Sequence, residues 1–285
     1  MTEIILQGLL LGGLYALFAL GQSLMFGVMR LTNTAQGDFI ILGGFFAIST
    51  VAATGLSPGL GLLVLIPLAF LAGYALQRFV LNYTLGRDPL PSLVVTFGLS
   101  IIIQNFLLEV YSADPKSLEA GSIALASFSV SDITVGILPL LTFGIALLAT
   151  MLLQALFSYT SLGRSFRAVS DDREAAQLMG LKPAIVYAQA TGIAFMLIAL
   201  AGGLQAMRTT IAPADGPLLL LFAFEAVIIG GMGSFWGTLV GALLLGLTQQ
   251  IGFRLDPGWG IWFGHLMFLV VLVIRPQGLF PKTRG

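Results

Sequence analysis

The sequence predicts an all-α, polytopic membrane protein of about eight transmembrane helices, and three observations carry this prediction. Hydrophobic residues make up 57% of the 285-residue chain, whereas charged residues make up only 9%. The mean hydropathy is +0.98. The apolar residues also gather in runs close to the roughly 20 residues that an α-helix needs to cross a bilayer. No polar stretch is long enough to build a second core, so residues 1–285 are expected to form one transmembrane domain.

Eight apolar segments account for the expected helices. They cover residues 4–29, 39–54, 60–81, 91–111, 135–157, 185–207, 217–252 and 259–274. The first follows Met-Thr-Glu, which lacks the basic start of a signal peptide, so it is expected to remain as a span. The seventh is too long for one crossing, and Gly-Gly-Met-Gly-Ser at 230–234 is expected to break it into two short helices. The chain should therefore make eight to nine passages, some with discontinuous helices.

If these segments cross the membrane in alternation, the basic residues are distributed unequally between its two sides. One side receives Arg30, Arg78, Arg87, Arg164, Arg167, Arg173, Lys182, Arg275, Lys282 and Arg284. The other side receives Lys116, Arg208 and Arg254, together with a long connection at about 112–134. Because Lys and Arg are enriched in cytoplasmic loops, the first side is predicted to be cytoplasmic. The N-terminus is then outside and the C-terminus is inside.

A charged loop at about 159–184 interrupts the apolar pattern. Its charged residues include Arg164, Arg167, Asp171, Asp172, Arg173 and Glu174. Such a density of charge is too costly for the apolar part of a bilayer, so the loop must face water or another protein. A short apolar stripe follows, formed by Ala175, Ala176, Leu178 and Met179. A short amphipathic helix that docks on a soluble partner has this pattern.

Polar side chains in or beside the apolar segments are candidates for a transport path. They are Gln22, Asn33, Gln36, Asp38, Gln104, Asn105 and Glu225. Glu225 is the strongest candidate, because a carboxylate at membrane depth must be stabilised by a partner, by water or by protonation. The alternative for these residues is a hydrogen bond between helices that serves packing alone, and for Asn33 it is a helix cap.

Glycines at the 230–234 break allow two interpretations. Gly233, Gly237 and Gly241 recur every four residues, as Gly8 and Gly12 do near the start, and such rows let helix backbones pack closely. Irregular backbone at membrane depth is also tolerated where it lines a cavity. On the second interpretation, the path forms where the break near 33–38 meets the break at 230–234, with Glu225 beside it.

Enzyme chemistry finds little support in the sequence. The chain has no G-x-x-x-x-G-K-[ST] phosphate loop, a single histidine (His265) and no cysteine, which disfavours its own ATP hydrolysis and a metal site. Gly-Leu-Ser-Pro-Gly at 55–59 matches G-x-S-x-G, but it lies in a short link rather than at a strand-to-helix elbow. A hydrolase based on Ser57 is therefore the weakest hypothesis. The net charge of zero gives no indication of nucleic acid.

Four segments resemble the permeases of branched-chain amino acid ABC transporters. Residues 163–180, GRSFRAVSDDREAAQLMG, resemble the cytoplasmic coupling motif of that family. Residues 33–39, NTAQGDF, resemble its Asn-Phe-Ala-His-Gly-Glu-Phe stretch, residues 230–237 its Gly-Gly-x-Gly-Ser-x-x-Gly run, and residues 275–280 its C-terminal end. The start and length are similar to those of the shorter, LivH-like subunit. Thr34 and Gln36 depart from the family pattern, which usually has Phe or Leu and His there, so the ligand is open.

The resemblance implies a permease subunit of an ABC importer in the bacterial inner membrane, which moves a small amino acid-like substrate. A branched-chain amino acid is the first expectation, and urea, amides and aromatic or other carboxylic acids are alternatives. The implied partners are the lipid bilayer, a LivM-like second permease, two cytoplasmic subunits that bind ATP and Mg²⁺, and a periplasmic substrate-binding protein. This chain itself is expected to hold no cofactor.

The resemblance also assigns roles to individual residues. Coupling to the ATPase is assigned to Arg164, Arg167, Asp171, Asp172, Arg173, Glu174, Ala175, Leu178, Met179 and Gly180. The translocation path is predicted from the two helix breaks and the buried carboxylate, and its residues are Asn33, Gln36, Gly37, Asp38, Glu225, Gly231, Gly233 and Ser234. An ion-coupled secondary transporter or a channel stays open as the alternative, because it would also contain broken helices and Glu225 but would not need a coupling loop.

Overall fold

The computed structural model describes residues 2–86, 88–121, 126–130 and 133–280, which form an all-α bundle. The long helices are α1 (Thr2–Met29), α2 (Gln36–Thr54), α3 (Pro58–Phe79), α4 (Leu90–Tyr111), α6 (Ile137–Tyr159), α9 (Pro183–Arg208), α10 (Gly216–Gly230), α11 (Phe235–Leu255) and α12 (Gly260–Ile274). The short elements are η1 (Leu81–Tyr83), α7 (Ser161–Asp171), α8 (Arg173–Leu178), η2 (Pro213–Asp215) and the strands β1 (Ser127–Val130) and β2 (Ile133–Gly136).

The predicted helices are confirmed, with ends that differ by a few residues. Eight helical segments of the described chain are long and apolar enough to cross a membrane. The segment predicted at 217–252 divides into α10 and α11, separated by residues 231–234, as the glycines indicated. The ninth, α12, has 15 residues, which extend about 22 Å and fall short of the roughly 30 Å of a hydrocarbon core.

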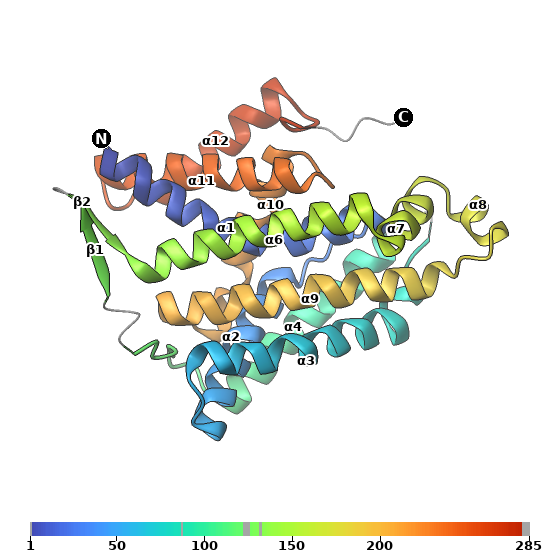
Figure 1. Cartoon of the computed structure of the whole chain (residues 1–285), viewed down its shortest axis with the longest axis horizontal. Coiled ribbons are helices and arrows are strands. Elements are labelled where there is room, and N and C mark those ends of the chain that lie inside the picture. Colours follow the sequence, from blue (N-terminus) through green and yellow to red (C-terminus); the bar gives the residue numbers. More distant parts are fainter. Residues whose placement is uncertain (1, 87, 122–125, 131–132, 281–285) are drawn as a thin grey trace.

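One element was not expected. The long connection after α4 contains the antiparallel pair of β1 and β2, in which Ser127 lies opposite Gly136. Ser-Phe-Ser-Val in β1 alternates polar and apolar residues, and Ile-Thr-Val in β2 is β-branched throughout, and both patterns favour strands. The hairpin lies in the direction of the N-terminus and away from α7 and α8 (Figure 1).

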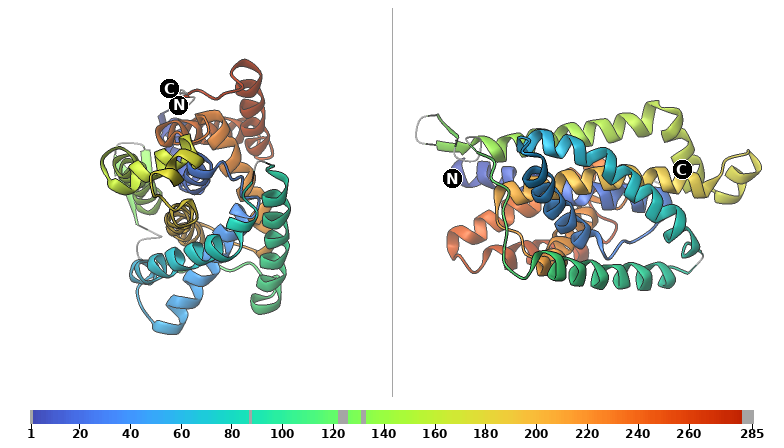
Figure 2. Two further views of the ribbon diagram at one scale, coloured as in Figure 1. Left: turned by 90° about the vertical axis from the view of Figure 1, so that its right-hand side faces the viewer. Right: turned by 90° about the horizontal axis from the view of Figure 1, so that it is seen from below.

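The bundle has two distinct ends. Figures 1 and 2 show the long helices running roughly along one direction, with the N-terminus at one end and α7 and α8 at the other. We call these the N-terminal end and the α7 end. The α7 end holds Arg30, Arg78, Arg164, Arg167, Arg173, Lys182 and Arg275 at helix ends and connections, whereas Lys116, Arg208 and Arg254 belong to the N-terminal end. The predicted separation of basic residues is thus present, and Arg87, Lys282 and Arg284 lie outside the described residues.

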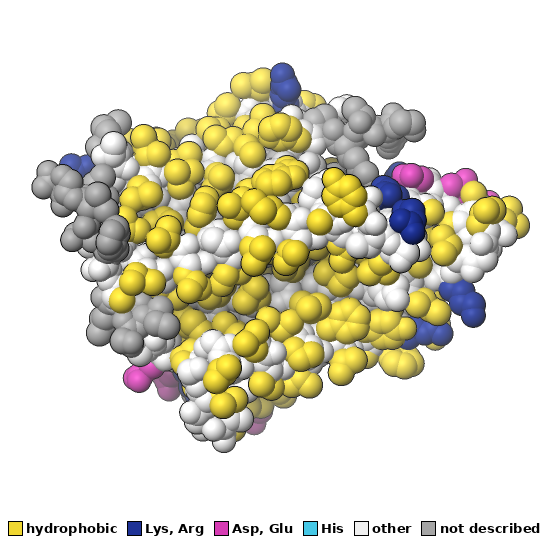
Figure 3. Space-filling view, viewed as in Figure 1, with side chains coloured by type: hydrophobic (Ala, Val, Ile, Leu, Met, Phe, Trp, Pro, Cys, Tyr) yellow, Lys and Arg dark blue, Asp and Glu magenta, His cyan; other side chains and the backbone are white. Residues whose placement is uncertain are grey.

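An apolar surface lies between the two ends. Hydrophobic side chains cover the middle of the face in Figure 3, and Lys and Arg gather near the α7 end. The outer helices α3 and α4 contribute many of the exposed apolar side chains, including Leu63, Leu71, Val94 and Phe97. In the most apolar 18-residue stretch of each of these helices, only 22% of the residues are buried. These helices therefore offer most of their surface to lipid.

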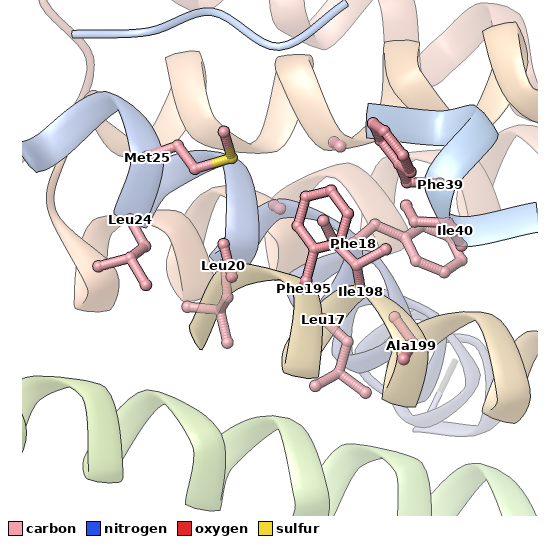
Figure 4. Packing of buried hydrophobic residues seen from close by; sticks show 14 of the residues in the cluster. Leu17, Phe18, Leu20, Leu24, Met25, Phe39, Ile40, Phe195, Ile198 and Ala199 are labelled. Carbon is pink, nitrogen blue, oxygen red and sulfur yellow. The ribbon is translucent and has the colours of Figure 1, made fainter. Parts of the chain in front are cut away.

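Helix α1 forms the centre of the bundle. In its most apolar 18-residue stretch, 67% of the residues are buried. Its residues Leu17, Phe18, Leu20, Leu24 and Met25 lie against Phe195, Ile198 and Ala199 of α9 and against Phe39 and Ile40 of α2 (Figure 4). On another side, α1 packs on α11 through its small residues. A Cβ on Gly12 would come within 2.6 Å of the Leu243 Cα, so the glycine rows serve close packing here.

Candidate functional site

Helix α7 is fixed to the bundle by one of its faces. Phe166 and Val169 are buried, and the Ser170 hydroxyl donates a hydrogen bond to the Gly27 carbonyl of α1 at 2.8 Å. The Thr160 side chain caps the first turn by accepting an amide hydrogen bond at 3.0 Å. The charged loop therefore begins with a helix whose apolar face packs on this chain, and the predicted stripe at 175–179 belongs to the next helix, α8 (Arg173–Leu178).

Helix α8 begins anew at Asp172. The Asp172 Oδ1 accepts hydrogen bonds from the amides of Glu174 at 2.8 Å and Ala175 at 3.0 Å, which is the pattern of an N-cap. The apolar side chains at the other end of α8 are almost wholly exposed, with Leu178 at 89% and Met179 at 84%. Two adjacent large apolar side chains in this position, beyond the bundle, form a surface that a partner can cover.

All ten residues predicted for coupling lie on α7, on α8 or at their ends. Arg167 is half-buried, and Arg164, Asp171, Asp172, Arg173, Glu174, Ala175, Leu178, Met179 and Gly180 are exposed. Gly180 has a φ of 85°, a left-handed conformation that ends α8 and suits glycine. The predicted apolar stripe is divided, because Ala176 is buried against the bundle while its neighbours face outward.

Helix α2 begins inside the bundle. After α1, residues 30–35 turn back, and the Gln36 Nε2 donates to the Phe18 carbonyl of α1 at 3.1 Å. Phe18 lies three turns before Met29, or roughly 16 Å at 1.5 Å per residue. The predicted first break is therefore a re-entrant segment that reaches membrane depth.

The starts of α2 and α10 meet at a junction. Gly37 lies so close to Gly216 that a Cβ on Gly37 would strike the Gly216 carbonyl oxygen. Asp38, in the first turn of α2, lies against Gly216, and its Oδ1 accepts a hydrogen bond from Nε2 of Gln104 on α4 at 2.8 Å. A carboxylate is stabilised at helix starts by free amides and the positive end of the dipole. Asp38 thus joins three helices at one buried point.

Two further path candidates beside this junction retain unsatisfied polar atoms. Asn33 and Gln36 are fully buried. The Asn33 Oδ1 accepts from the Ala35 amide at 3.1 Å, so Asn33 does stabilise the turn. Within the described residues, Asn33 Nδ2 and Gln36 Oε1 have no hydrogen-bond partner. Because buried polar groups are normally paired, these two atoms are available to a ligand or water.

The break between α10 and α11 lies elsewhere, at the α7 end. Gly233 lies against Gly27, near the end of α1, because a Cβ on Gly27 would lie 3.2 Å from the Gly233 Cα. Gly231 lies against Gly278, and the Leu279 amide donates to the Ile229 carbonyl at 2.8 Å. The C-terminal segment thereby covers this break.

The two breaks do not meet, contrary to the prediction. The Gln36 side chain of the first break contacts α1 at Phe18 and Gly21, whereas the second break contacts α1 at Gly27, about 9 Å beyond Gly21 at 1.5 Å per residue. The first break instead meets the start of α10. Ser234 has a local role as well, because its Oγ accepts from the Gly237 amide at 3.1 Å and caps α11.

Glu225 joins α10 to α12. Its Oε1 is hydrogen-bonded to Nδ1 of His265, and the His265 ring stacks near Phe222 with centroids 6.4 Å apart. Glu225 is 5% exposed, and its Oε2 has no partner in the described part of the chain. This arrangement supports the packing interpretation of Glu225, although the free Oε2 leaves the residue in the set of path predictions.

Glu225→Gln is therefore expected to preserve both assembly and most transport, because an amide keeps the shape and a hydrogen bond to His265. Glu225→Ala leaves His265 unpaired and should weaken the attachment of α12 by about 1 kcal/mol. Complex yield and uptake measured on both variants check this. A large loss of uptake by Glu225→Gln at normal yield would instead assign the carboxylate to the path.

The structure gives Ser57 no base. Ser57 is exposed at the start of α3, whereas His265 lies within α12 and is engaged by Glu225. The described residues also contain no group of three His, Cys, Asp or Glu side chains that would suit a metal ion.

A pocket at the N-terminal end was missed in the sequence. It has a volume of about 280 Å³ and lies between α1, α2, α9 and α10. Arg208 and Asp215 line it together with apolar side chains. A signal for it exists in the sequence, because residues 208–215 place two charges and Pro213 in a short link between apolar segments.

The comparisons with known proteins agree with this architecture. The family model described as "Branched-chain amino acid transport system / permease component" matches residues 4–274. The chain is 28% identical to the "High-affinity branched-chain amino acid transport system permease protein BraD" of Pseudomonas aeruginosa, over 98% of this chain and 95% of that protein. It is 27% identical to the LivH permease protein of Escherichia coli K12, over 97% and 94%.

A solved structure supports the fold. A chain of PsaBC from Streptococcus pneumoniae, in complex with Fab, superposes with a TM-score of 0.51 at 13% identity, over 96% of this chain and 93% of that chain. At this identity the likeness concerns the fold alone. The family match covers nearly all of the sequence, and the bundle contains the membrane-spanning helices that a bacterial multi-pass permease requires. The chain therefore belongs to the family of branched-chain amino acid transport system permease components and is a permease subunit of an ABC importer.

Proposed function

We propose that the chain imports a small amino acid, with a branched-chain amino acid as the first candidate, across the bacterial inner membrane in a complex driven by ATP. The BraD and LivH relatives are both named as branched-chain amino acid transport permeases, which supports this substrate class. The observation that carries the proposal is the exposed pair Leu178 and Met179 at the tip of α8. They form an apolar anchor for a groove on a cytoplasmic ATPase.

The attachment of this anchor suits the transmission of force. Asp172 caps α8, and α7 is fixed to α1 through the hydrogen bond between Ser170 and Gly27. A movement imposed on α8 by two closing ATPase subunits would then reach α1, the central helix of the bundle. The charged side chains of α7 and α8 set the orientation of the partner, since complementary charges at the rim of an interface favour the correct binding partner.

In this proposal the α7 end is cytoplasmic, the N-terminus is outside and the C-terminus is inside. The concentration of Lys and Arg on the α7 end supports that orientation. The remaining partners are a second permease subunit, two ATPases that hold ATP and Mg²⁺, and a periplasmic substrate-binding protein. The path runs along α1 and past the junction of α2 and α10, where Asn33 and Gln36 offer unsatisfied polar atoms.

Purification in mild detergent tests this composition. The tagged chain is expected to bring down a second permease and a chain with a G-x-x-x-x-G-K-[ST] loop. The double variant Leu178→Asp and Met179→Asp should keep the permease and lose the ATPase, because the substitutions place two carboxylates in the apolar contact. Retention of the ATPase by the double variant, or a wild-type chain that purifies without any ATPase, would contradict the proposal.

A further inference from the structure

We propose that the pocket at the N-terminal end is the outer binding site for the transported amino acid. In this site Arg208 holds the carboxylate, Asp215 faces the ammonium group and the apolar wall holds an aliphatic side chain. This inference rests on the proposed import of an amino acid and adds to it the location of the site and the groups that recognise the substrate.

The pocket has the size and position that this role requires. A cavity of about 150 Å³ accepts a molecule of benzene, so a volume of about 280 Å³ has room for an aliphatic amino acid. Its α1 wall runs from Leu11 to Phe18, roughly 10 Å along the helix. Phe18 is also the residue whose carbonyl accepts the hydrogen bond of Gln36. The inner end of the pocket therefore adjoins the junction of α2 and α10, and the outer end adjoins the N-terminal end of the bundle.

The charges in the pocket are complementary to a zwitterion. Arg208 is the last residue of α9, and its Nη1 reaches only the Leu10 carbonyl, at 3.5 Å. Arg208 and Asp215 line the same pocket, yet the one salt bridge among the described residues is that of His265 and Glu225. A half-buried guanidinium without a carboxylate partner is costly, and its planar fork matches a carboxylate with two parallel hydrogen bonds.

Asp215 has a fixed position opposite this cation. Its Oδ2 accepts a hydrogen bond from the Ala212 amide at 2.7 Å, which holds the carboxylate at the start of α10. The pocket thus offers two opposite charges that do not neutralise each other. A ligand that carries both a carboxylate and an ammonium group satisfies both of them, whereas a simple carboxylic acid or a neutral amide satisfies only one or neither.

Gln205 and Thr209 lie beside Arg208 in the lining, Tyr15 contributes its ring, and the lining residues other than these and Asp215 are apolar and limit side-chain size. Leu14, Ile41, Leu219 and Phe222 are buried side chains of the pocket. Leu218 also lines it and is 39% exposed, so a larger side chain at 218 can be accommodated without overpacking the core. This apolar part of the wall takes a hydrocarbon side chain and offers a polar one no side-chain hydrogen-bond partner.

The first test removes the positive charge of Arg208. In vesicles that contain the complete transporter, Arg208→Gln should reduce uptake of radiolabelled L-leucine at least tenfold at normal complex yield. Arg208→Lys should retain an intermediate rate, because the charge remains and the bidentate geometry is lost. Arg254→Gln is the matched control, since Arg254 is an exposed cation at the same end of the bundle and does not line the pocket. It should transport leucine normally.

The second test reduces the space that the pocket offers to the substrate side chain. Leu218→Phe should lower leucine uptake at least fivefold more than alanine uptake, because the ring occupies space that the longer substrate needs. Leu221→Phe is the control, as Leu221 is a 49% exposed residue of the same helix outside the pocket lining. A loss of stability alone would lower the uptake of both amino acids equally and would overturn the size assignment.

The two proposals fail in different ways. If the wild-type complex imports leucine while Arg208→Gln and Leu218→Phe behave like their controls, the importer stands and the pocket assignment is overturned. If the wild-type complex imports a neutral amide such as urea and no amino acid, the proposed substrate class and the role of Arg208 are both overturned.

Discussion

Leu178→Asp is expected to abolish ATP-driven uptake by the assembled transporter, with a loss of at least tenfold, while the chain still inserts into the membrane. Leu178 is 89% exposed at the end of α8, so the substitution removes no packing within this chain. In the complex, however, the aspartate would be buried without a partner in the apolar contact with the ATPase. At typical interfaces, the removal of a central apolar anchor and the burial of an unpaired charge each cost on the order of 2 kcal/mol or more of binding free energy.

Uptake of L-leucine and the rate of ATP hydrolysis should be measured together on this variant. Loss of uptake with an ATPase rate that no longer responds to substrate would indicate uncoupling. Leu255→Asp is the matched control, because Leu255 is an exposed leucine at the last residue of α11, at the opposite end of the bundle. Glu174→Lys should show a smaller uncoupling, and normal uptake by both α8 variants would refute the assignment of α8 as the coupling helix.

Gly37→Ala is the second substitution with a large expected effect, and it should remove most folded protein from the membrane. The added Cβ would strike the Gly216 carbonyl oxygen and would lie 2.7 Å from the Leu220 amide nitrogen. Both are backbone atoms, so α2 and α10 must separate to make room. Overpacking in a well-packed core costs about 1–3 kcal/mol, and the cost is expected at the upper end here because no side chain can move aside.

The measurement is the yield and the thermal stability of the purified complex. Gly59→Ala serves as the control, since the space around its Cβ position is open and the residue lies at the exposed start of α3. Gly59→Ala should be neutral. If Gly37→Ala also gives normal yield and stability, the close junction of α2 and α10 is wrong.

Local patterns explain which parts of the fold were predictable. The helices followed from apolar runs of membrane length, and the division between α10 and α11 followed from weak helix formers at 230–234. The division between α7 and α8 was also readable, because Asp172 is an N-cap residue in front of an acidic first turn. The charge of Asp172, however, is the more conspicuous property and favours a role in partner recognition.

Long-range pairings explain what was missed. No local signal connects Gly37 with Gly216 or Glu225 with His265, because each contact depends on how two distant helices pack. The choice of the wrong partner for the first break has the same origin. The glycines at 230–234 were the conspicuous interruption of apolar sequence, whereas the packing of Gly37 on Gly216 has no local signal.

The two departures from the family pattern acquire physical roles in the structure. Gln36, which stands where the family usually has His, places its amide on the Phe18 carbonyl and leaves its Oε1 free. The Thr34 hydroxyl lies 2.8 Å from that of Thr96 on α4, which anchors the re-entrant segment. Both residues therefore help to hold the first break in place.

The central claim is that an ATPase, rather than an ion gradient, drives transport through this chain. Uptake of L-leucine into vesicles that contain the complete transporter and its binding protein tests it most directly. With ATP supplied on the side of the α7 end, uptake should proceed against the leucine gradient and persist when ionophores collapse the proton and sodium gradients. Uptake that needs no ATP and disappears with the ion gradient would contradict the account and identify an ion-coupled transporter.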